Sequence, residues 1–389
     1  LYPPMFIERI HNTLAQQLQN DSKLYGQKYL EQLLLKKNDE ISNIISPIYL
    51  WSKSINAKDE NDLKEILEEL NSILRDSSNY KSKTERYCLL ILQELDKKNT
   101  LDVKTKEKIL QKNINNLEAY PYINKVMVGR SEGEKRAWHR YLLAYSYNYL
   151  YTIKPNAAEY LKKASDYSPD LNDRQYKHAY FYDAALLTGN TREFGFQSKY
   201  QKYLVENNRN SDALALLSDI AFGNPSDYNI KTLREFYEKL KYSNPFSDYW
   251  TNYIHEKGKP VPKLKIQFEK EELDLTKEPN NWIYIDVWGT WCSPCREELP
   301  ALQSFFDENT KSSNSKLKVY TFSFGSQNLL KFMTENKYTF PVSEIDKQTN
   351  DLFEVSGYPT KILISPQGNF IKIPFGVDWK IYIKNYTMM

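Results

Sequence analysis

The chain has 389 residues, of which 41% are hydrophobic and 26% are charged, and its formal net charge is +3. This length exceeds that of one ordinary core, so we expect a soluble protein of two or three domains. The small, evenly mixed charge gives no electrostatic reason for a nucleic-acid partner, and no stretch approaches the ~20 consecutive apolar residues of a transmembrane helix.

Helical periodicity dominates residues 1–257. From Asp21 onward, apolar residues recur every three or four positions in segments of about 12 to 20 residues, separated by short polar breaks. Nothing in this region shows the pattern of paired strands. We therefore predict an all-helical domain over residues 1–257.

The second half of this region carries a spacing typical of tetratricopeptide-like repeats. In such repeats, small residues let two helices approach, large residues fill the gap, and a proline ends the second helix. The residues at these positions are Leu143, Ala144, Tyr147, Ala157, Leu161, Ala164 and Pro169, then Ala179 and Tyr182, then Leu233, Tyr237, Leu240 and Pro245. Because helical repeats form concave surfaces that hold peptides, we expect this domain to bind a client protein or to self-associate.

Two other features of the helical region fit a core better than a site. Cys88 lies in an apolar helical run, so we predict a buried structural thiol. An aromatic stripe at helical spacing is also more typical of a core than of a binding groove. Its members are Tyr141, Tyr145, Tyr147, Tyr149 and Tyr151.

Residues 258–262 break the helical pattern, because one glycine and two prolines fall within five positions. We take this segment as the linker to a second domain at residues 263–389. The strands expected in that domain cover residues 264–268, 282–288, 317–324, 360–365 and 369–374. The expected helices cover residues 295–309, 327–336 and 347–355, followed by a last short helix. Alternating strands and helices with a closing hairpin indicate a mixed α/β sheet.

The segment Trp288-Gly-Thr-Trp-Cys-Ser-Pro-Cys-Arg-Glu-Glu-Leu-Pro300 carries the candidate chemistry. Two residues separate Cys292 from Cys295, so their sulfurs can join within one helical turn. Cys292 falls between an expected strand and an expected helix, where free backbone N–H groups and the helix dipole favour a thiolate. In such a setting a thiol pKa of ~8.5 can drop to roughly 3.5–7.5. We therefore predict that Cys292 is the nucleophile and that Cys295 is the more buried, resolving thiol.

Neighbouring residues support this reading. Pro294 restricts the loop and is tolerated in the first turn of a helix, and Trp291 would flank the site as an apolar platform. A zinc site is not expected, because it needs four ligands and the sequence offers no second cysteine pair. Apart from the redox-active disulfide, we expect no cofactor.

The cysteine motif resembles the active site of the TlpA/ResA-like branch of the thioredoxin superfamily. The resemblance covers residues 263–389 and leaves the helical domain outside it. It implies a thioredoxin-like fold and a thiol-disulfide oxidoreductase that acts on protein thiols and disulfides. It also implies a periplasmic or otherwise extracytoplasmic bacterial location. The sequence begins at Leu1 rather than at a methionine, which leaves room for a targeting segment or membrane anchor ahead of it.

The resemblance also assigns roles to residues around the cysteines. Asp286 falls on the position of thioredoxin's buried aspartate, which helps to remove the proton from the second cysteine. Glu298 falls on a glutamate that ResA-like proteins keep beside the site. Pro300 matches the proline that kinks the active-site helix. Pro359 matches the cis-proline, which would turn the backbone of Tyr358 toward an extended substrate chain.

Several alternatives stay open. Asp286 could be a structural buried acid, and Glu298 an ordinary partner of the helix dipole. Ser293 replaces thioredoxin's glycine, and Tyr358 is bulkier than the residue usual before the cis-proline, which leaves the direction of electron flow open. We favour reduction of protein disulfides. The other readings are a helical repeat scaffold with an accessory thioredoxin-like domain, and a disulfide isomerase.

Overall fold

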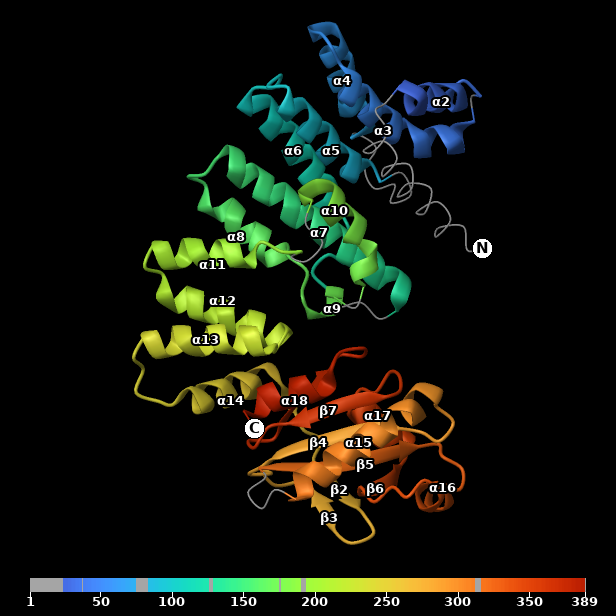
Figure 1. The fold of residues 1–389 in the computed structure, drawn as a ribbon, viewed down its shortest axis with the longest axis vertical. Coiled ribbons are helices and arrows are strands. Elements are labelled where there is room, and N and C mark those ends of the chain that lie inside the picture. Colours follow the sequence, from blue (N-terminus) through green and yellow to red (C-terminus); the bar gives the residue numbers. More distant parts are fainter. Residues whose placement is uncertain are drawn as a thin grey trace. The chain divides into compact units, whose positions relative to one another are not determined.

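The computed structural model describes residues 24–36, 38–74, 83–125, 129–174, 176–189, 194–311 and 316–388. Residues 1–23, the beginning of the predicted helical domain, lie outside this part of the chain. The chain divides into two compact units, one that ends at Asn207 and one that begins at Asn208. The predicted order of a helical region followed by a mixed sheet is confirmed (Figure 1).

The described part of the first unit is helical. Its elements are α2 (Leu24–Leu34), α3 (Asp39–Asn56), α4 (Glu60–Ile73), α5 (Thr84–Lys97), α6 (Val103–Glu118), α7 (Arg130–Ile153), α8 (Ala158–Tyr167), α9 (Leu171–Arg174), the 3₁₀ helix η1 (Lys177–Ala179), α10 (Phe181–Thr188) and α11 (Gln197–Glu206). Helix α3 begins at Asp39 because the side chain of Asn38 accepts the Ile41 N–H. On α4, Ile66 and Leu70 lie one turn apart and are buried, as the periodicity predicts.

The aromatic stripe and Cys88, which we assigned to the core of this unit, lie there. Four tyrosines of the aromatic stripe on α7 are buried, so they line a core rather than an open groove. They are Tyr141, Tyr145, Tyr147 and Tyr149. Cys88 on α5 is buried and unpaired, as predicted. A buried ion pair between Arg86 and Asp183 joins α5 to α10, and each charge offsets the desolvation of the other.

Some of the residues with tetratricopeptide-like spacing lie on helices that pack together, and others do not. Leu143 on α7 and Leu161 on α8 are buried where these two helices pack together. Ala179, in contrast, ends the short η1, and Tyr182 lies in the separate helix α10. The chain is therefore divided where an intervening first helix was expected, and the repeat stays a prediction.

The second unit combines three helices with a sheet domain. Its elements are α12 (Asn210–Gly223), α13 (Asp227–Lys239), α14 (Phe246–Lys257), β1 (Lys259–Pro260), β2 (Lys265–Gln267), β3 (Glu272–Asp274), β4 (Trp282–Trp288), α15 (Ser293–Lys311), β5 (Leu317–Phe324), α16 (Leu329–Glu335), β6 (Val342–Ile345), α17 (Lys347–Leu352), β7 (Thr360–Ile364), β8 (Asn369–Ile373) and α18 (Trp379–Thr387). The main sheet has the strand order β1-β8-β7-β4-β5-β6, and β2 pairs separately with β3. Strand β4 is parallel to β5 and antiparallel to β7, so the sheet is mixed.

Strand β4 divides its side chains between two cores. Tyr284 and Trp288 belong to the core that β4 shares with α15 and α18, whereas Ile285 and Val287 belong to the core that it shares with β2 and β3. Successive side chains of a strand point to opposite faces of the sheet. Asp286 therefore lies on the face that α15 covers.

Helices α12, α13 and α14 share a core with the sheet domain. The fully buried Trp250 of α14 donates its Nε1–H to the carbonyl of Asn385 on α18 at 2.9 Å. Asn385 Nδ2 donates to the Pro225 carbonyl at 2.7 Å, and the Tyr386 hydroxyl donates to the Phe222 carbonyl at 2.6 Å. Because these bonds tie α18 to the chain before residue 258, the compact unit extends ahead of the predicted linker.

The predicted linker itself contributes to the sheet. Lys259 and Pro260 form β1, which pairs antiparallel with β8 at the edge of the sheet. A proline is tolerated there because an edge strand leaves some of its N–H positions unused. Asn369 Nδ2 on β8 also donates to the His255 carbonyl at 2.9 Å. A domain boundary at residues 258–262 stays a prediction.

The Trp250→Ala substitution tests whether α14 is part of this unit. It leaves a cavity and deprives the Asn385 carbonyl of its donor, so we expect the free energy of unfolding of the unit to fall by about 3–5 kcal/mol. Hydrogen exchange of the α18 amides measures this change. Tyr228→Ala on α13, where the side chain is 76% exposed, is the control. Unchanged exchange in α18 would show that α14 does not hold this helix.

Candidate redox site

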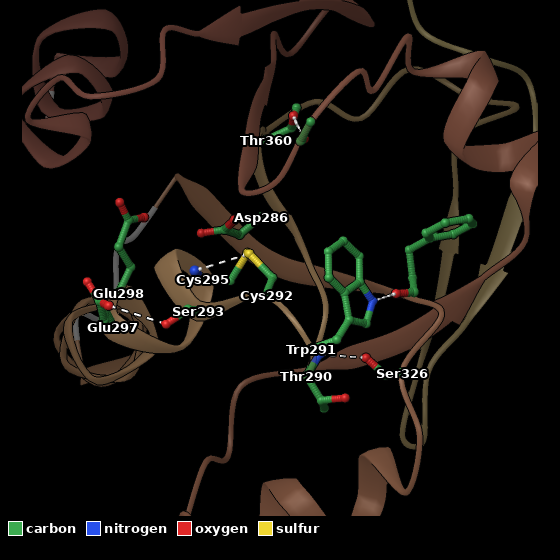
Figure 2. The surroundings of a disulfide bond; sticks show 12 residues. Asp286, Thr290, Trp291, Cys292, Ser293, Cys295, Glu297, Glu298, Ser326 and Thr360 are labelled. Atoms are coloured by element: carbon green, nitrogen blue, oxygen red, sulfur yellow. Dashed lines mark hydrogen bonds between the residues drawn. A yellow bond between two sulfur atoms is a disulfide. The ribbon is translucent and has the colours of Figure 1, made fainter. Parts of the chain in front are cut away.

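Cys292 and Cys295 form a disulfide at the junction between β4 and α15 (Figure 2). Cys292 directly precedes α15, and the Cys295 N–H donates to the Cys292 Sγ at 3.3 Å. A helix N-terminus presents unsatisfied N–H groups and a partial positive charge, both of which stabilise an anion. After reduction of the disulfide, these groups favour a thiolate at Cys292.

The two cysteines differ slightly in exposure. Cys292 is 5% exposed and Cys295 is 1% exposed. An attacking sulfur must reach the substrate, whereas a resolving sulfur needs to reach only its partner cysteine. The difference supports Cys292 as the attacking thiolate, although the two roles themselves stay predictions.

An aromatic surface borders the disulfide. Trp291, which is 56% exposed, donates its Nε1–H to the Phe324 carbonyl at 2.9 Å. Its ring meets that of Tyr358 in a T-shaped contact with 5.2 Å between ring centroids, and Tyr358 stacks on Phe324 at 5.8 Å. A Cβ at Gly289 would lie 2.5 Å from Trp291 Nε1, so the glycine of the motif makes room for this ring. Trp291 is thus held in place although more than half of its surface is exposed.

The segment before β7 completes this surface. The peptide bond between Tyr358 and Pro359 is cis, in agreement with the prediction. The Tyr358 hydroxyl donates to Asn350 Oδ1 on α17 at 3.0 Å. The ring of Tyr358 contacts Trp291 and Phe324 while its hydroxyl is bonded to Asn350, so this large side chain packs against the domain. Its predicted part in substrate binding stays a prediction.

Asp286 is the buried acid of the site, and Figure 2 shows it above the disulfide in that view. The Tyr284 hydroxyl donates to Asp286 Oδ2 at 3.0 Å, and Lys361 Nζ lies 3.1 Å from the same oxygen. Within the part of the chain that is described, Asp286 Oδ1 has no hydrogen-bond partner. Burial raises the pKa of Asp286, while Lys361 and Tyr284 oppose this rise. A carboxyl group with a raised pKa and an unoccupied oxygen can exchange a proton near neutral pH.

Glu298 joins this cluster through Lys361. Lys361 Nζ lies 2.5 Å from Glu298 Oε2, and the Glu298 side chain is 38% exposed. Lys361 is also the cross-strand partner of Asp286 in the pairing of β4 with β7. Burial by itself would lower the pKa of Lys361, but the two carboxylates outweigh that effect and raise it. The ammonium group therefore stays charged between two acids.

The residues predicted to shape the site lie along the first turns of α15. The Ser293 hydroxyl donates to Glu297 Oε1 at 3.5 Å, across one turn of the helix. Pro294 is the second residue of α15, where a missing N–H costs no helical hydrogen bond. Pro300 lies inside α15, where a proline removes one such bond and bends the axis. We predicted that Ser293, Pro294 and Pro300 shape the site, and these roles stay predictions.

The residues that the structure describes contain no group of three or more His, Cys, Asp or Glu side chains arranged to hold a metal ion. Among their helices, none is both long enough and apolar enough to cross a membrane.

Comparisons with known proteins agree with the site geometry. Residues 257–373 match the AhpC/TSA family. Over 131 residues, the chain is 27% identical to the thiol-disulfide oxidoreductase ResA of Bacillus subtilis strain 168, an alignment that covers 33% of this chain and 73% of ResA. Residues 257–373 form a thioredoxin-like domain. The resemblance that the cysteine motif indicates is therefore confirmed for this domain.

Other relatives of the thioredoxin-like domain include the sporulation thiol-disulfide oxidoreductase A of the same Bacillus strain. It is 28% identical over 142 residues, which cover 34% of this chain and 82% of that protein. Among solved structures, the thioredoxin domain of a thiol-disulfide oxidoreductase from Bacteroides vulgatus covers 33% of this chain and 96% of its own, at 20% identity and a TM-score of 0.29. StoA from Bacillus subtilis covers 33% of this chain and 99% of its own chain, at 23% identity and a TM-score of 0.28.

Sequence reasoning missed two residues that shape the thioredoxin-like domain's site. Lys361 went unnoticed, although a lysine inside the otherwise apolar run of β7 was a signal that something pairs with it. Gly289 was quoted as part of the motif, but its reason, the space needed by the Trp291 ring, depends on the folded backbone. The contact of Glu298 with Lys361 also could not be read from the helix alone.

Proposed function

We propose that this protein is a thiol-disulfide oxidoreductase that reduces disulfides of other proteins. The observation that carries the proposal is the position of the Cys292 Sγ, which is bonded to Cys295 and accepts an N–H at the start of α15. The names of the related ResA proteins support the same activity. The exposed ring of Trp291 supplies an apolar surface for an extended substrate segment.

The first step transfers a bond from the substrate to Cys292. In the reduced protein, the Cys292 thiolate attacks one sulfur of the substrate disulfide. A mixed disulfide forms between Cys292 and the substrate. The other substrate sulfur leaves with the electron pair of the broken bond and takes up a proton.

The second step closes the disulfide of the enzyme. Cys295 gives its proton to Asp286, and the resulting thiolate attacks the Cys292 Sγ. The mixed disulfide breaks, and the second substrate sulfur leaves as a thiolate. Two electrons have then passed from the cysteine pair to the substrate, and a dithiol redox partner must reduce the pair before another turnover.

Cys292→Ser tests this function in the full chain. It removes the attacking sulfur, so we expect the reduction of insulin disulfides by dithiothreitol to fall to the uncatalysed rate. Turbidity of the released insulin chains measures the rate. Cys88→Ala is the matched control, because Cys88 is a buried thiol of the helical unit. Equal rates for Cys292→Ser and the wild-type protein would contradict the proposal and favour the scaffold reading.

We also propose that the helical unit binds the client protein. An open groove of about 990 Å³ lies along α4, between the end of α3 and the end of α5. Leu63 and Leu67 of α4 and Leu95 of α5 give it apolar contacts, while Lys64 and Glu68 contribute charge. An apolar groove with a few charged groups suits a segment of another protein.

Lys64→Glu tests the role of this groove. Reversing the charge should raise the KM for a client protein disulfide several-fold and leave the rate with a small disulfide unchanged. Lys202→Glu is the control, since Lys202 is an exposed lysine on α11 of the same unit. The groove has no part in client binding if both variants show the wild-type KM.

We propose an extracytoplasmic bacterial location, such as the periplasm. The similarity to ResA-like oxidoreductases supports this location. Fractionation of cells that produce the native protein tests it, and recovery of the protein with the cytoplasm would contradict it.

A further inference from the structure

The turn that carries Cys292 is held against the chain that follows β5. Strand β4 ends at Trp288 and α15 begins at Ser293, so residues 289–292 connect the two elements. The Cys292 N–H donates to the Gly289 carbonyl at 3.0 Å, which is the hydrogen bond of a β-turn. The position of the Cys292 sulfur therefore depends on how this turn is fixed as well as on α15.

Ser326 accepts a hydrogen bond from the backbone of this turn. Its Oγ accepts the Thr290 N–H at 2.9 Å (Figure 2). The same Oγ accepts the hydroxyl of Ser323, at the end of β5, at 2.6 Å. Next to it, the Phe324 carbonyl accepts the Nε1–H of Trp291 at 2.9 Å. The chain after β5 thus binds a main-chain donor and a side-chain donor of the turn.

Glu344 on β6 fixes the backbone of Ser326. Strands β5 and β6 are parallel, and their register places Glu344 beside Ser323. Glu344 Oε1 accepts the Ser326 N–H at 3.1 Å. Gly325, whose φ is +62°, lets the chain turn between these contacts. Because Ser326 is bonded at both its N–H and its hydroxyl, it offers Thr290 an acceptor with a fixed position.

We propose that Ser326 is a positioning residue that fixes the turn at residues 289–292, so that the Cys292 thiolate meets a substrate disulfide in line. The inference rests on the proposed function, because this geometry matters when Cys292 attacks a sulfur. In that attack a bond forms between the Cys292 Sγ and one substrate sulfur. The other substrate sulfur leaves with the electron pair of the broken bond and takes up a proton. Ser326 acts on this step through the Thr290 N–H.

Activation and orientation of Cys292 come from different parts of the chain. The N-terminus of α15 stabilises the thiolate, whereas Ser326 binds the turn ahead of it. An attacking atom that is already aligned reacts faster, and a misplacement of about 1 Å can cost about 10²-fold in rate. Loss of the Ser326 hydroxyl should therefore slow attack on a bulky disulfide and leave the pH dependence of Cys292 reactivity unchanged.

The test uses the full chain with Cys295→Ser, in which Cys292 forms a mixed disulfide that no second cysteine of the site resolves. Mass spectrometry follows the initial rate of its formation with insulin. Ser326→Ala should lower this rate constant about tenfold. Alkylation of the same sulfur by iodoacetamide, a small reagent, should keep its rate and pH dependence. Cys88 does not compete, because it is buried and burial raises the pKa of its thiol.

Three further variants complete the test. Ser326→Thr keeps the hydroxyl, so both reactions should stay near the parent rates. Ser304→Ala is the matched control, because Ser304 is an exposed serine of α15 whose hydroxyl donates to the Pro300 carbonyl at 3.1 Å. Glu344→Ala removes the acceptor of the Ser326 N–H. It should slow the reaction with insulin several-fold, and it covers the case in which Ser326→Ala does not fold.

Hydrogen exchange gives a readout that needs no reaction at the cysteine. The Thr290 amide loses its acceptor in Ser326→Ala, so its exchange should become about tenfold faster or more. The Arg296 amide is the internal reference, since it donates to the Cys292 carbonyl at 3.1 Å within the start of α15. Its exchange should keep the parent rate.

The outcomes separate the role of Ser326 from the proposed function. In Ser326→Ala, an unchanged rate with insulin, an unchanged exchange of the Thr290 amide or an equal fall in the iodoacetamide rate would overturn the role of Ser326. Failure of Ser326→Thr to restore the rate would do the same. A parent protein that forms no mixed disulfide with insulin would instead defeat the proposed function, and exchange at Thr290 would still show whether Ser326 holds the turn.

Discussion

The start of α15 is the constraint on which the chemistry of this protein depends. Strand β4 is buried along its whole length in the middle of the sheet, which fixes the point where the chain leaves the strand. Cys292 directly precedes α15, and the Cys295 N–H points to the sulfur of Cys292. The backbone therefore supplies the electrostatic field that the proposed attacking thiolate needs.

The sheet adds a buried carboxyl group to this backbone feature. Asp286 is buried on the face that α15 covers, and strand pairing brings Lys361 opposite to it. Buried charges rarely improve stability over apolar residues of similar size. Within the described chain one oxygen of Asp286 has no hydrogen-bond partner, which agrees with the proposal that this acid takes up a proton.

Local sequence patterns were enough to predict the elements that carry the site. Strand β5 was predicted at residues 317–324 and has these bounds, and α15 begins two residues before its predicted start at Cys295. Strands β3 and β6, with three and four residues, are too short to show an alternating pattern and were missed. Long-range contacts were missed for another reason. The bond from Trp250 to Asn385 joins residues 135 positions apart, and the pairing of Asp286 with Lys361 depends on the register of two strands.

The N-terminus of α15 should hold Cys292 as an anion at neutral pH. A Cys295→Ser variant isolates this sulfur and keeps the backbone N–H that points to it, since a serine has the same main chain. The pH dependence of its rate of alkylation by iodoacetamide gives the pKa of Cys292 directly. We expect a value well below the ~8.5 of a free cysteine, whereas a value at or above ~8.5 would show that the helix terminus does not stabilise the thiolate.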